Sequence, residues 1–277
     1  MAGFPLLLGD RVALITGGSR GIGAETVRLF VQAGARVGFN FRRSRDQALA
    51  LAAECGGRPR CLAIERKLDC AADGHSLVEA AVRVFGRLDI LVANHGIWES
   101  DDVPIAEMTE EQWSNTMSVN LDSVFGLVQA TVAQFDKQIA DAREAEATGG
   151  QAPAASEGAS GHIVLISSTA GQRGEAFHAD YAVTKGALIS LTKSLSSELA
   201  PRGIRVNCVA PGWVTTDMSA AALGNRESGA KIMAGIPVGR AATPREIAGP
   251  ILFLCTTLAG FISGEVLNVN GGAVLAG

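Results

Sequence analysis

The chain has 277 residues, of which 47% are hydrophobic, so it is long enough to bury the core of one large α/β domain. Its 24 Lys and Arg residues nearly balance its 28 Asp and Glu residues, and the net charge of −4 argues against a protein that binds nucleic acid or an anionic membrane. The five cysteines form no C-x-x-C pair, and the four histidines show no metal-ligand spacing. We therefore expect reduced cysteines, no bound metal and a cytoplasmic protein.

Two apolar stretches bear on targeting and on membranes. Residues 1–10 contain no basic region, and their apolar run at 4–8 is too short for a signal peptide. Residues 247–264 carry no charge, but they include Pro250 and several residues that form turns. We interpret this second stretch as a buried helix followed by a turn, with a membrane span as the disfavoured alternative.

The pattern along the chain predicts strands and helices in alternation. Short apolar runs typical of buried strands lie at 12–15, 36–41, 88–93, 162–167, 204–209 and 265–269. Helical periodicity marks residues 24–34, 48–54, 74–85, 109–133, 179–199 and 244–254. This order predicts an α/β fold, namely a single doubly wound domain over residues 1–277 with about seven parallel strands and helices on both faces.

One segment departs from this alternation. Residues 135–147 are rich in charged side chains and suit a solvated extension of a helix, whereas residues 148–161 consist mainly of Gly, Ala, Ser and Pro with one charge. Composition of the second kind is typical of mobile loops. We interpret residues 136–161 as a surface insertion, whose mobile part is 148–161.

A glycine-rich sequence lies between the first predicted strand and the first predicted helix. It reads Thr16-Gly-Gly-Ser-Arg-Gly-Ile-Gly23. Glycine lets the backbone turn sharply and approach a phosphate without a Cβ in the way, and the N–H groups at a helix start attract an anion. The spacing differs from G-x-G-x-x-G, so by itself this sequence fits either a dinucleotide site or an ordinary turn.

Tyr181, the only tyrosine, lies four residues before Lys185 on one predicted helix, so the two side chains share a face. A cation about 4 Å from a phenolate stabilises it by up to about 4 kcal/mol at an effective dielectric constant near 20, which would lower the tyrosine pKa toward neutrality. Such a tyrosine can exchange a proton with a carbonyl or alcohol oxygen. A buried tyrosine beside an unrelated lysine is the alternative. Ser168, at the end of a predicted strand, favours the catalytic interpretation.

Taken together, these features resemble the short-chain dehydrogenase/reductase family over residues 8–275. The shared order is the glycine turn, Asn-x-Gly, a serine, Tyr-x3-Lys and Pro-Gly. The resemblance implies a Rossmann domain whose four catalytic positions are filled by Asn120, Ser168, Tyr181 and Lys185. Within the family, the chain is similar to 3-oxoacyl-acyl carrier protein reductases, and also to many small-ketone and sugar dehydrogenases.

The resemblance implies a role for each catalytic position during carbonyl reduction. Tyr181 gives the carbonyl oxygen its proton, and Ser168 hydrogen-bonds that oxygen. Lys185 holds the nicotinamide ribose and lowers the Tyr181 pKa, while Asn120 positions a water in the proton path. The expected function is NADP(H)-dependent interconversion of a ketone and a secondary alcohol, with a 3-oxoacyl thioester as one candidate substrate. A non-catalytic scaffold that senses the cofactor is the rival, which the complete set of four residues disfavours.

The family also implies the positions that contact the cofactor. Its Asn-Asn-Ala-Gly sequence appears here as Ala-Asn-His-Gly at 93–96, where His95 is either a packed ring or a proton relay. Either Lys67 or Asp69 falls at the position beside adenine, and we favour Asp69. We expect no metal ligand. The expected cofactor-binding residues are Gly17, Ser19, Arg20, Gly21, Ile22, Gly23, Arg42, Arg43, Asp69, Asn94, Gly96, Tyr181, Lys185, Pro211, Gly212, Val214 and Thr216.

The end of the second predicted strand favours NADP(H) over NAD(H). An acidic residue there holds the ribose 2′-hydroxyl of NAD, whereas an arginine accommodates the 2′-phosphate of NADP. Here Phe41 occupies the acidic position and is followed by Arg42 and Arg43, and Arg20 in the glycine turn can reach the same phosphate. Two solvated arginines are the alternative interpretation.

The family implies a homotetramer as well as a small carbonyl or alcohol substrate. The apolar stretches 182–199 and 266–275 are consistent with subunit interfaces, although the second also fits a core. Acyl carrier protein is a possible partner that we disfavour. Carrier-protein reductases dock the acidic carrier through two basic positions, of which Arg202 matches one, whereas the other falls in 156–161 beside Glu157.

Overall fold

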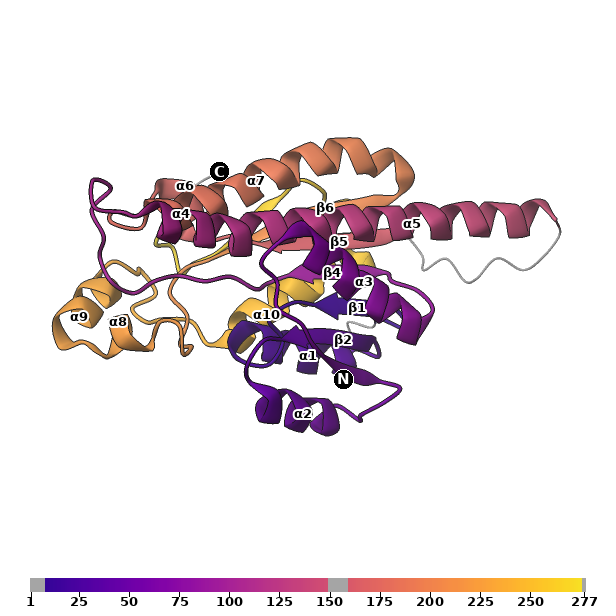
Figure 1. Ribbon diagram of the computed structural model, residues 1–277, viewed down its shortest axis with the longest axis horizontal. Coiled ribbons are helices and arrows are strands. Elements are labelled where there is room, and N and C mark those ends of the chain that lie inside the picture. The colour runs from indigo at the N-terminus through magenta and orange to yellow at the C-terminus, as the bar shows by residue number, and fades with distance from the viewer. Residues whose placement is uncertain (1–7, 149–158, 276–277) are drawn as a thin grey trace.

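The computed structural model describes residues 8–148 and 159–275, and its centre is a parallel sheet (Figure 1). Seven strands follow one another in the order β3-β2-β1-β4-β5-β6-β7, and every neighbouring pair is parallel. The strands are β1 (Val12–Ile15), β2 (Arg36–Phe41), β3 (Cys61–Glu65), β4 (Ile90–Ala93), β5 (Gly161–Ile166), β6 (Ile204–Pro211) and β7 (Val266–Val269). The strand order reverses between β1 and β4, which creates a crevice at their carboxyl ends.

Helices cover both faces of the sheet, as the doubly wound prediction requires. One face packs against α1 (Gly21–Gln32), α2 (Arg45–Glu54) and α10 (Pro244–Leu254). The other face packs against α3 (Ala71–Phe85), α5 (Ser123–Ala147) and α7 (Ala179–Leu199). The shorter helices are α4 (Glu110–Met117), α6 (Thr169–Arg173), α8 (Ala220–Gly224) and α9 (Arg226–Ala234).

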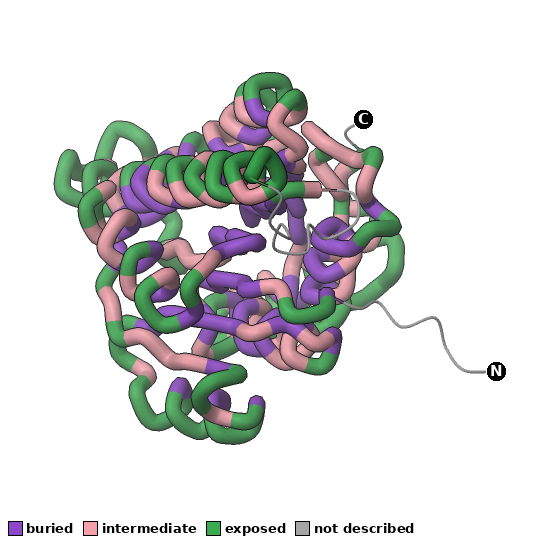
Figure 2. Tube along the Cα trace, turned by 90° about the vertical axis from the view of Figure 1, so that its right-hand side faces the viewer, coloured by how far each residue is buried: buried purple, intermediate pink, exposed green. Residues whose placement is uncertain are grey.

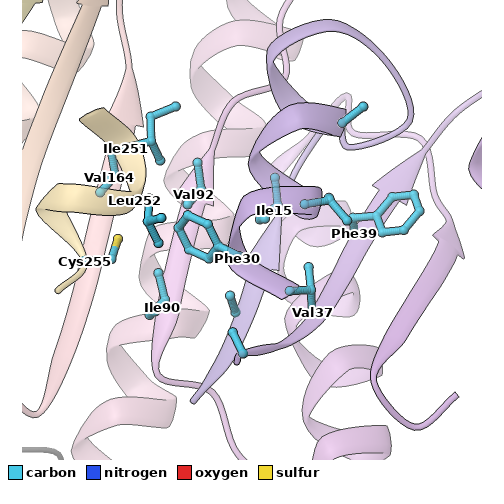
Figure 3. Packing of buried hydrophobic residues seen from close by; sticks show 14 of the residues in the cluster. Ile15, Phe30, Val37, Phe39, Ile90, Val92, Val164, Ile251, Leu252 and Cys255 are labelled. Carbon is cyan, nitrogen blue, oxygen red and sulfur yellow. The ribbon is translucent and has the colours of Figure 1, made fainter. Parts of the chain in front are cut away.

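Two hydrophobic clusters, one on each face, hold these layers together. Side chains alternate along β1, so that Ala13 and Ile15 enter one cluster while Val12 and Leu14 enter the other. In the first cluster, residues of α1 and α10 pack over the central strands (Figure 3). Buried residues are concentrated along the sheet and exposed ones on the outer helix faces (Figure 2). Burial on both faces explains why the central strands are apolar without a break.

The structure differs from the predicted elements at several places, and the helices α6, α8 and α9 were not predicted. Strand β3 was not predicted, because it pairs only with β2 at the sheet edge and its residues are mostly half-buried. The helix predicted at 109–133 is divided into α4 and α5 by a π-helical turn, Ser118–Asp122. The charged extension predicted at 135–147 is confirmed, since α5 continues to Ala147.

Of the predicted insertion 136–161, residues 149–158 lie outside the described residues. Among the helices that the structure describes, none is long and apolar enough to cross a membrane. The stretch 247–264 instead contributes to α10 and to a short 3₁₀ turn, Thr257–Ala259.

Candidate active site

A cleft of about 460 Å³ opens at the carboxyl ends of the central strands. This volume lies within the range of sites for small molecules and cofactors, and the position is the one at which open α/β sheets bind ligands. Of the catalytic and cofactor residues predicted from the sequence, all line the cleft except Gly23 and Asn120. The fold therefore brings together residues that are more than 190 positions apart in the chain.

The glycine turn forms one end of the cleft, between β1 and α1. Gly17 and Gly21 have φ angles of +63° and +54°, which residues with a Cβ rarely adopt. A Cβ at Gly23 would lie 2.1 Å from the carbonyl oxygen of Gly17, so this position requires glycine even though it does not line the cleft. No side chain caps the start of α1, and its first turn carries no acidic residue. The turn therefore offers backbone N–H groups to an anion, as a pyrophosphate site requires.

Two asparagines hold the glycine turn in place. The Asn40 side chain accepts a hydrogen bond from the Gly17 N–H at 2.7 Å and donates one to the Arg66 carbonyl oxygen at 3.0 Å. The Asn94 side chain donates to the Thr16 carbonyl oxygen at 3.0 Å. Sequence reasoning missed Asn40. The sequence feature that could have indicated Asn40 is a single polar residue between Phe39 and Phe41, at the apolar end of β2, where the structure buries it.

Basic side chains line the part of the cleft beyond β2. Arg42 and Arg43 both lie there and are exposed. Arg20 also lines the cleft and forms an exposed ion pair with Asp217 at 3.2 Å. Asp69 belongs to the lining, whereas Lys67 forms an ion pair with Asp69 from outside the cleft. This placement favours Asp69 over Lys67 for the position expected beside adenine.

Ser168, Tyr181 and Lys185 meet at the ends of β5 and α7. Ser168 caps α6 by accepting a hydrogen bond from the Ala170 N–H at 3.1 Å, and it also hydrogen-bonds Tyr181. Lys185 is buried, and its Nζ donates to the Ile166 carbonyl oxygen at 2.8 Å. The same Nζ lies 5.7 Å from the centroid of the Tyr181 ring. The helix cap at Ser168 and the hydrogen bond from Lys185 to Ile166 thus hold these side chains close to Tyr181.

Burial controls the pKa values of this group. It raises the pKa of Tyr181 to about 12, against the opposing effect of the hydrogen bond from Ser168. It lowers the pKa of Lys185 to about 8. Neither pKa shift has the other member of the pair among its causes, so the expectation that Lys185 lowers the pKa of Tyr181 stays a prediction.

Asn120 lies beside the cleft, in the π-helical turn between α4 and α5. Its amide oxygen accepts a hydrogen bond from the Ile97 N–H at 2.8 Å, and its amide nitrogen donates to the Ile97 carbonyl oxygen at 2.9 Å. The same nitrogen is 3.3 Å from the Thr184 hydroxyl. Asn120 therefore ties the segment after β4 to α7. Its role in holding a water stays a prediction.

His95 is fixed at both ring nitrogens. Nδ1 lies 2.8 Å from the Thr16 hydroxyl, and Nε2 lies 2.7 Å from the Ser123 hydroxyl. Nε2 also lies 3.1 Å from the Val119 carbonyl oxygen, which can only accept, so in the neutral ring Nε2 carries the proton and Nδ1 is an acceptor. The Thr16 hydroxyl beside Nδ1 also lies 3.4 Å from the Val92 carbonyl oxygen. Burial and the charge of Lys185 lower the pKa of His95 to about 3. The ring is neutral and hydrogen-bonded at both nitrogens, which favours the packed-ring interpretation over a proton relay.

The turn after β6 closes the cleft opposite the glycine turn. Its predicted residues Pro211, Gly212, Val214 and Thr216 all line the cleft. The hydroxyl of Ser219, which sequence reasoning missed, donates to the Val214 carbonyl oxygen. It also accepts a hydrogen bond from the Thr216 N–H at 3.2 Å, so it fixes this turn.

Beyond Tyr181 the cleft has a wall that the sequence did not predict. Trp98 stacks on His178 with ring centroids 5.0 Å apart, and Trp213 meets Trp98 edge to face at 6.0 Å. Arg173 and Glu175 also line this part. These residues come from three separate stretches of the chain and follow no sequence motif, so only the fold brings them into one cleft region.

Comparisons with known proteins agree with this geometry. A family model described as short chain dehydrogenase matches residues 11–142, and one described as enoyl-(acyl carrier protein) reductase matches residues 145–274. A 3-oxoacyl-[acyl-carrier-protein] reductase of Chlamydia muridarum is 34% identical over 273 residues, which cover 96% of this chain and 98% of the relative.

Solved structures give the same result. A short-chain dehydrogenase/reductase (glucose/ribitol dehydrogenase) of Brucella melitensis has a TM-score of 0.82 at 34% identity and covers 97% of this chain and 98% of its own. A putative 2-deoxy-d-gluconate 3-dehydrogenase of Agrobacterium tumefaciens with bound NADP has a TM-score of 0.80 at 30% identity, over 97% of this chain and 98% of its own.

Proposed function

This chain belongs to the short-chain dehydrogenase/reductase family, and on that premise we propose that it uses NADP(H) to interconvert a ketone and a secondary alcohol. The observation that carries the proposal is the cleft itself, in which a glycine turn suited to a pyrophosphate and the group Ser168, Tyr181 and Lys185 line one continuous space. A scaffold without activity would not require the three side chains to converge there.

The described residues fit a dinucleotide phosphate. Gly17, Gly21 and Gly23 leave room at the start of α1 for a pyrophosphate, since side chains at these positions would strain or fill the turn. Arg42 and Arg43 supply positive charge where a ribose 2′-phosphate would lie, and the acid that NAD-selective enzymes carry there is replaced by Phe41. When bound, the reduced nicotinamide supplies the hydride that reaches the carbonyl carbon.

Tyr181 supplies the proton of the reaction. Its raised pKa keeps the hydroxyl protonated at neutral pH, so in reduction it donates that proton to the carbonyl oxygen as the carbon accepts the hydride. Ser168 orients the same oxygen through its hydroxyl. Lys185, held by Ile166, lies below the Tyr181 ring and contributes its ammonium group to binding the nicotinamide ribose.

The similarity to 3-oxoacyl reductases makes a 3-oxoacyl thioester one candidate substrate, and the similarity to sugar dehydrogenases makes a hydroxylated ketone another. A cytoplasmic location and a tetrameric assembly stay predictions from the family.

The test is a screen of ketones with NADPH and with NADH, in which turnover is measured as the loss of absorbance of the reduced nicotinamide. We expect turnover of at least one ketone, with a higher kcat/KM for NADPH than for NADH. Tight binding of NADPH without turnover across thioester, aliphatic and hydroxylated ketones would instead support the scaffold.

A further inference from the structure

The substrate side of the cleft contains an acidic side chain that the proposed chemistry does not use. Glu175 lies in the loop 174–178, between α6 and α7, directly before the helix that carries Tyr181. Backbone hydrogen bonds anchor this loop at both ends, because the Gly174 N–H donates to the Ala170 carbonyl oxygen at 2.9 Å and the Phe177 carbonyl oxygen accepts from the Val103 N–H at 3.2 Å. Glu175 lies between these two anchored residues.

The Glu175 carboxylate is half-buried, and within residues 8–148 and 159–275 it has neither a hydrogen bond nor an ion pair. It lies near enough to Tyr181 for its charge to raise the pKa of the phenol. The charged or titratable groups that act on it are Arg173, His178 and Asp102, of which Asp102 repels it. A carboxylate that is partly desolvated and unpaired is costly, and a ligand that hydrogen-bonds it relieves that cost.

Aromatic rings belong to the surroundings of this carboxylate, because His178, whose charge acts on Glu175, stacks on Trp98, and Trp98 and Trp213 line the same cleft as Glu175. Trp98 lies flat on His178, with 18° between the ring planes, and Trp213 meets it at 87°. Apolar rings near a carboxylate lower the local dielectric constant and so strengthen its interaction with a donor or a charge. Arg173 lines the same part of the cleft, but it is exposed and forms no ion pair with Glu175 among the described residues.

We propose that Glu175 is a specificity-determining residue that selects carbonyl substrates carrying a hydrogen-bond donor, an ammonium or hydroxyl group, close to the reacting carbon, and rejects substrates carrying a carboxylate there. The proposal rests on the function proposed above. It also separates the candidate substrates, because a 3-oxoacyl thioester offers only an acceptor oxygen at that place, whereas a hydroxylated or amino ketone offers a donor.

Four ketones of nearly equal size test the selection, because they differ only in the group two carbons from the carbonyl. They are 4-amino-2-butanone, 4-hydroxy-2-butanone, 2-pentanone and acetoacetate. We expect the wild-type kcat/KM with NADPH to be at least tenfold higher for the donor-bearing ketones than for acetoacetate. A preference shared by the amine and the alcohol indicates recognition of a donor, whereas a preference for the amine alone indicates recognition of charge.

Glu175→Gln should remove this selection. Relative to 2-pentanone measured with the same variant, we expect acetoacetate to gain at least tenfold in kcat/KM and the aminoketone to lose at least tenfold. Normalising to 2-pentanone separates selectivity from any general effect of Glu175 on Tyr181. Glu79→Gln, which changes an exposed acid on α3 away from the cleft, should leave all four values unchanged.

A binding measurement gives a second, independent readout. Two of the three tryptophans line the cleft, so quenching of tryptophan fluorescence in the enzyme loaded with NADP⁺ should report binding of 4-amino-2-butanone and acetoacetate, which cannot react with the oxidised cofactor. We expect the aminoketone to bind at least tenfold more tightly than acetoacetate to the wild type and the difference to disappear in Glu175→Gln.

The outcomes distinguish the two proposals. If 2-pentanone is reduced but the relative rates and affinities are the same in Glu175→Gln, the role of Glu175 is refuted and the ketone reductase function stands. If no ketone or thioester is reduced, the proposed function fails, and the binding measurement alone decides whether Glu175 selects donors.

Discussion

The two arginines after β2 carry the cofactor preference at the scale of single residues. Arg42 and Arg43 are exposed at the edge of the cleft, and the position before them is the apolar Phe41. A phosphate here gains charge-assisted hydrogen bonds, each contributing about 1.5 to 3 kcal/mol. The bare hydroxyl of NAD gains little from a cation.

Arg42→Ala should therefore weaken NADPH binding about tenfold or more and leave NADH binding nearly unchanged, because about 1.4 kcal/mol corresponds to a tenfold change in Kd. Titration calorimetry with both cofactors measures this. Arg45→Ala is the matched control, since Arg45 is exposed on α2, outside the cleft, where it pairs with Glu65 at 2.6 Å. An equal loss for both cofactors in Arg42→Ala would refute the assignment.

The lowered pKa of His95 should make the free energy of unfolding depend on pH. Its pKa is lowered from 6.5 to about 3 in the folded protein, so the unfolded chain binds one more proton between these values. The contribution of the neutral His95 ring to the free energy of unfolding is fully present above pH 6.5. It is lost as the pH falls toward 3, with a slope of up to about 1.4 kcal/mol per pH unit. Buried His162 acts in the same direction.

We expect the free energy of unfolding, measured with urea between pH 7 and pH 5, to fall less steeply in His95→Asn than in the wild type. His75→Asn is the matched control, since His75 lies on α3, outside the cleft, with its Nε2 2.8 Å from the Gln129 side-chain oxygen. A slope unchanged in His95→Asn would show that the ring titrates normally in the folded protein.

At the scale of elements, the extended α5 changes the surface around Arg202. This residue is the one basic position that matches the docking sites of carrier-protein reductases. In this structure Arg202 donates to both carboxylate oxygens of Asp136 on α5 at 2.7 Å, and it is 3.5 Å from Glu198. Its charge is therefore largely neutralised within the protein, which disfavours docking of an acidic carrier.

We accordingly expect an acetoacetyl group on a short thiol to be reduced with a kcat/KM at least equal to that of the same group on acyl carrier protein, at low and at high salt. Asp136→Asn should free Arg202 and increase the rate for the carrier-bound substrate at low salt only. A large, salt-sensitive advantage of the carrier with the wild-type enzyme would overturn this prediction.

Elements with local signals could be predicted from the sequence, and elements set by distant contacts could not. The bounds of α10 agree with the prediction because Thr243 and Glu246 form a capping box, a signal contained within four residues. Strand β3 depends on a neighbour more than twenty residues away. The π-helical turn within 109–133 was not predicted either.

The same distinction holds for the site. Tyr181 and Lys185 share a helix face by spacing alone, and the glycine turn is contiguous. Glu175, Trp98 and Trp213 become neighbours only through the fold. The pKa of Tyr181 could not be predicted either, because it depends on burial rather than on the distance to one charge.

At the scale of the whole molecule, apolar side chains remain exposed near both regions expected to form subunit interfaces. Phe125 on α5 and Val183 on α7 are 52% and 48% exposed, and Phe261, close to β7, is fully exposed. Exposed apolar surface of this kind is typical of association sites.

We expect a homotetramer in light scattering at micromolar concentration. Phe261→Glu should weaken the assembly, because it places a charge in the expected interface, whereas Leu49→Glu, which changes an exposed leucine on α2, should leave it intact. A wild-type monomer at this concentration would contradict the prediction.

The central claim is that Tyr181 supplies the proton of a hydride transfer with NADP(H). The direct measurement is kcat for a reduced ketone together with the Kd of NADPH, in the wild type, Tyr181→Phe and Lys185→Ala. Because only the hydroxyl is removed, Tyr181→Phe should lose most of kcat with cofactor affinity within a few-fold of wild type, whereas Lys185→Ala should impair both quantities. A Tyr181→Phe enzyme that kept a tenth of the wild-type kcat would contradict the claim and place the proton donor elsewhere.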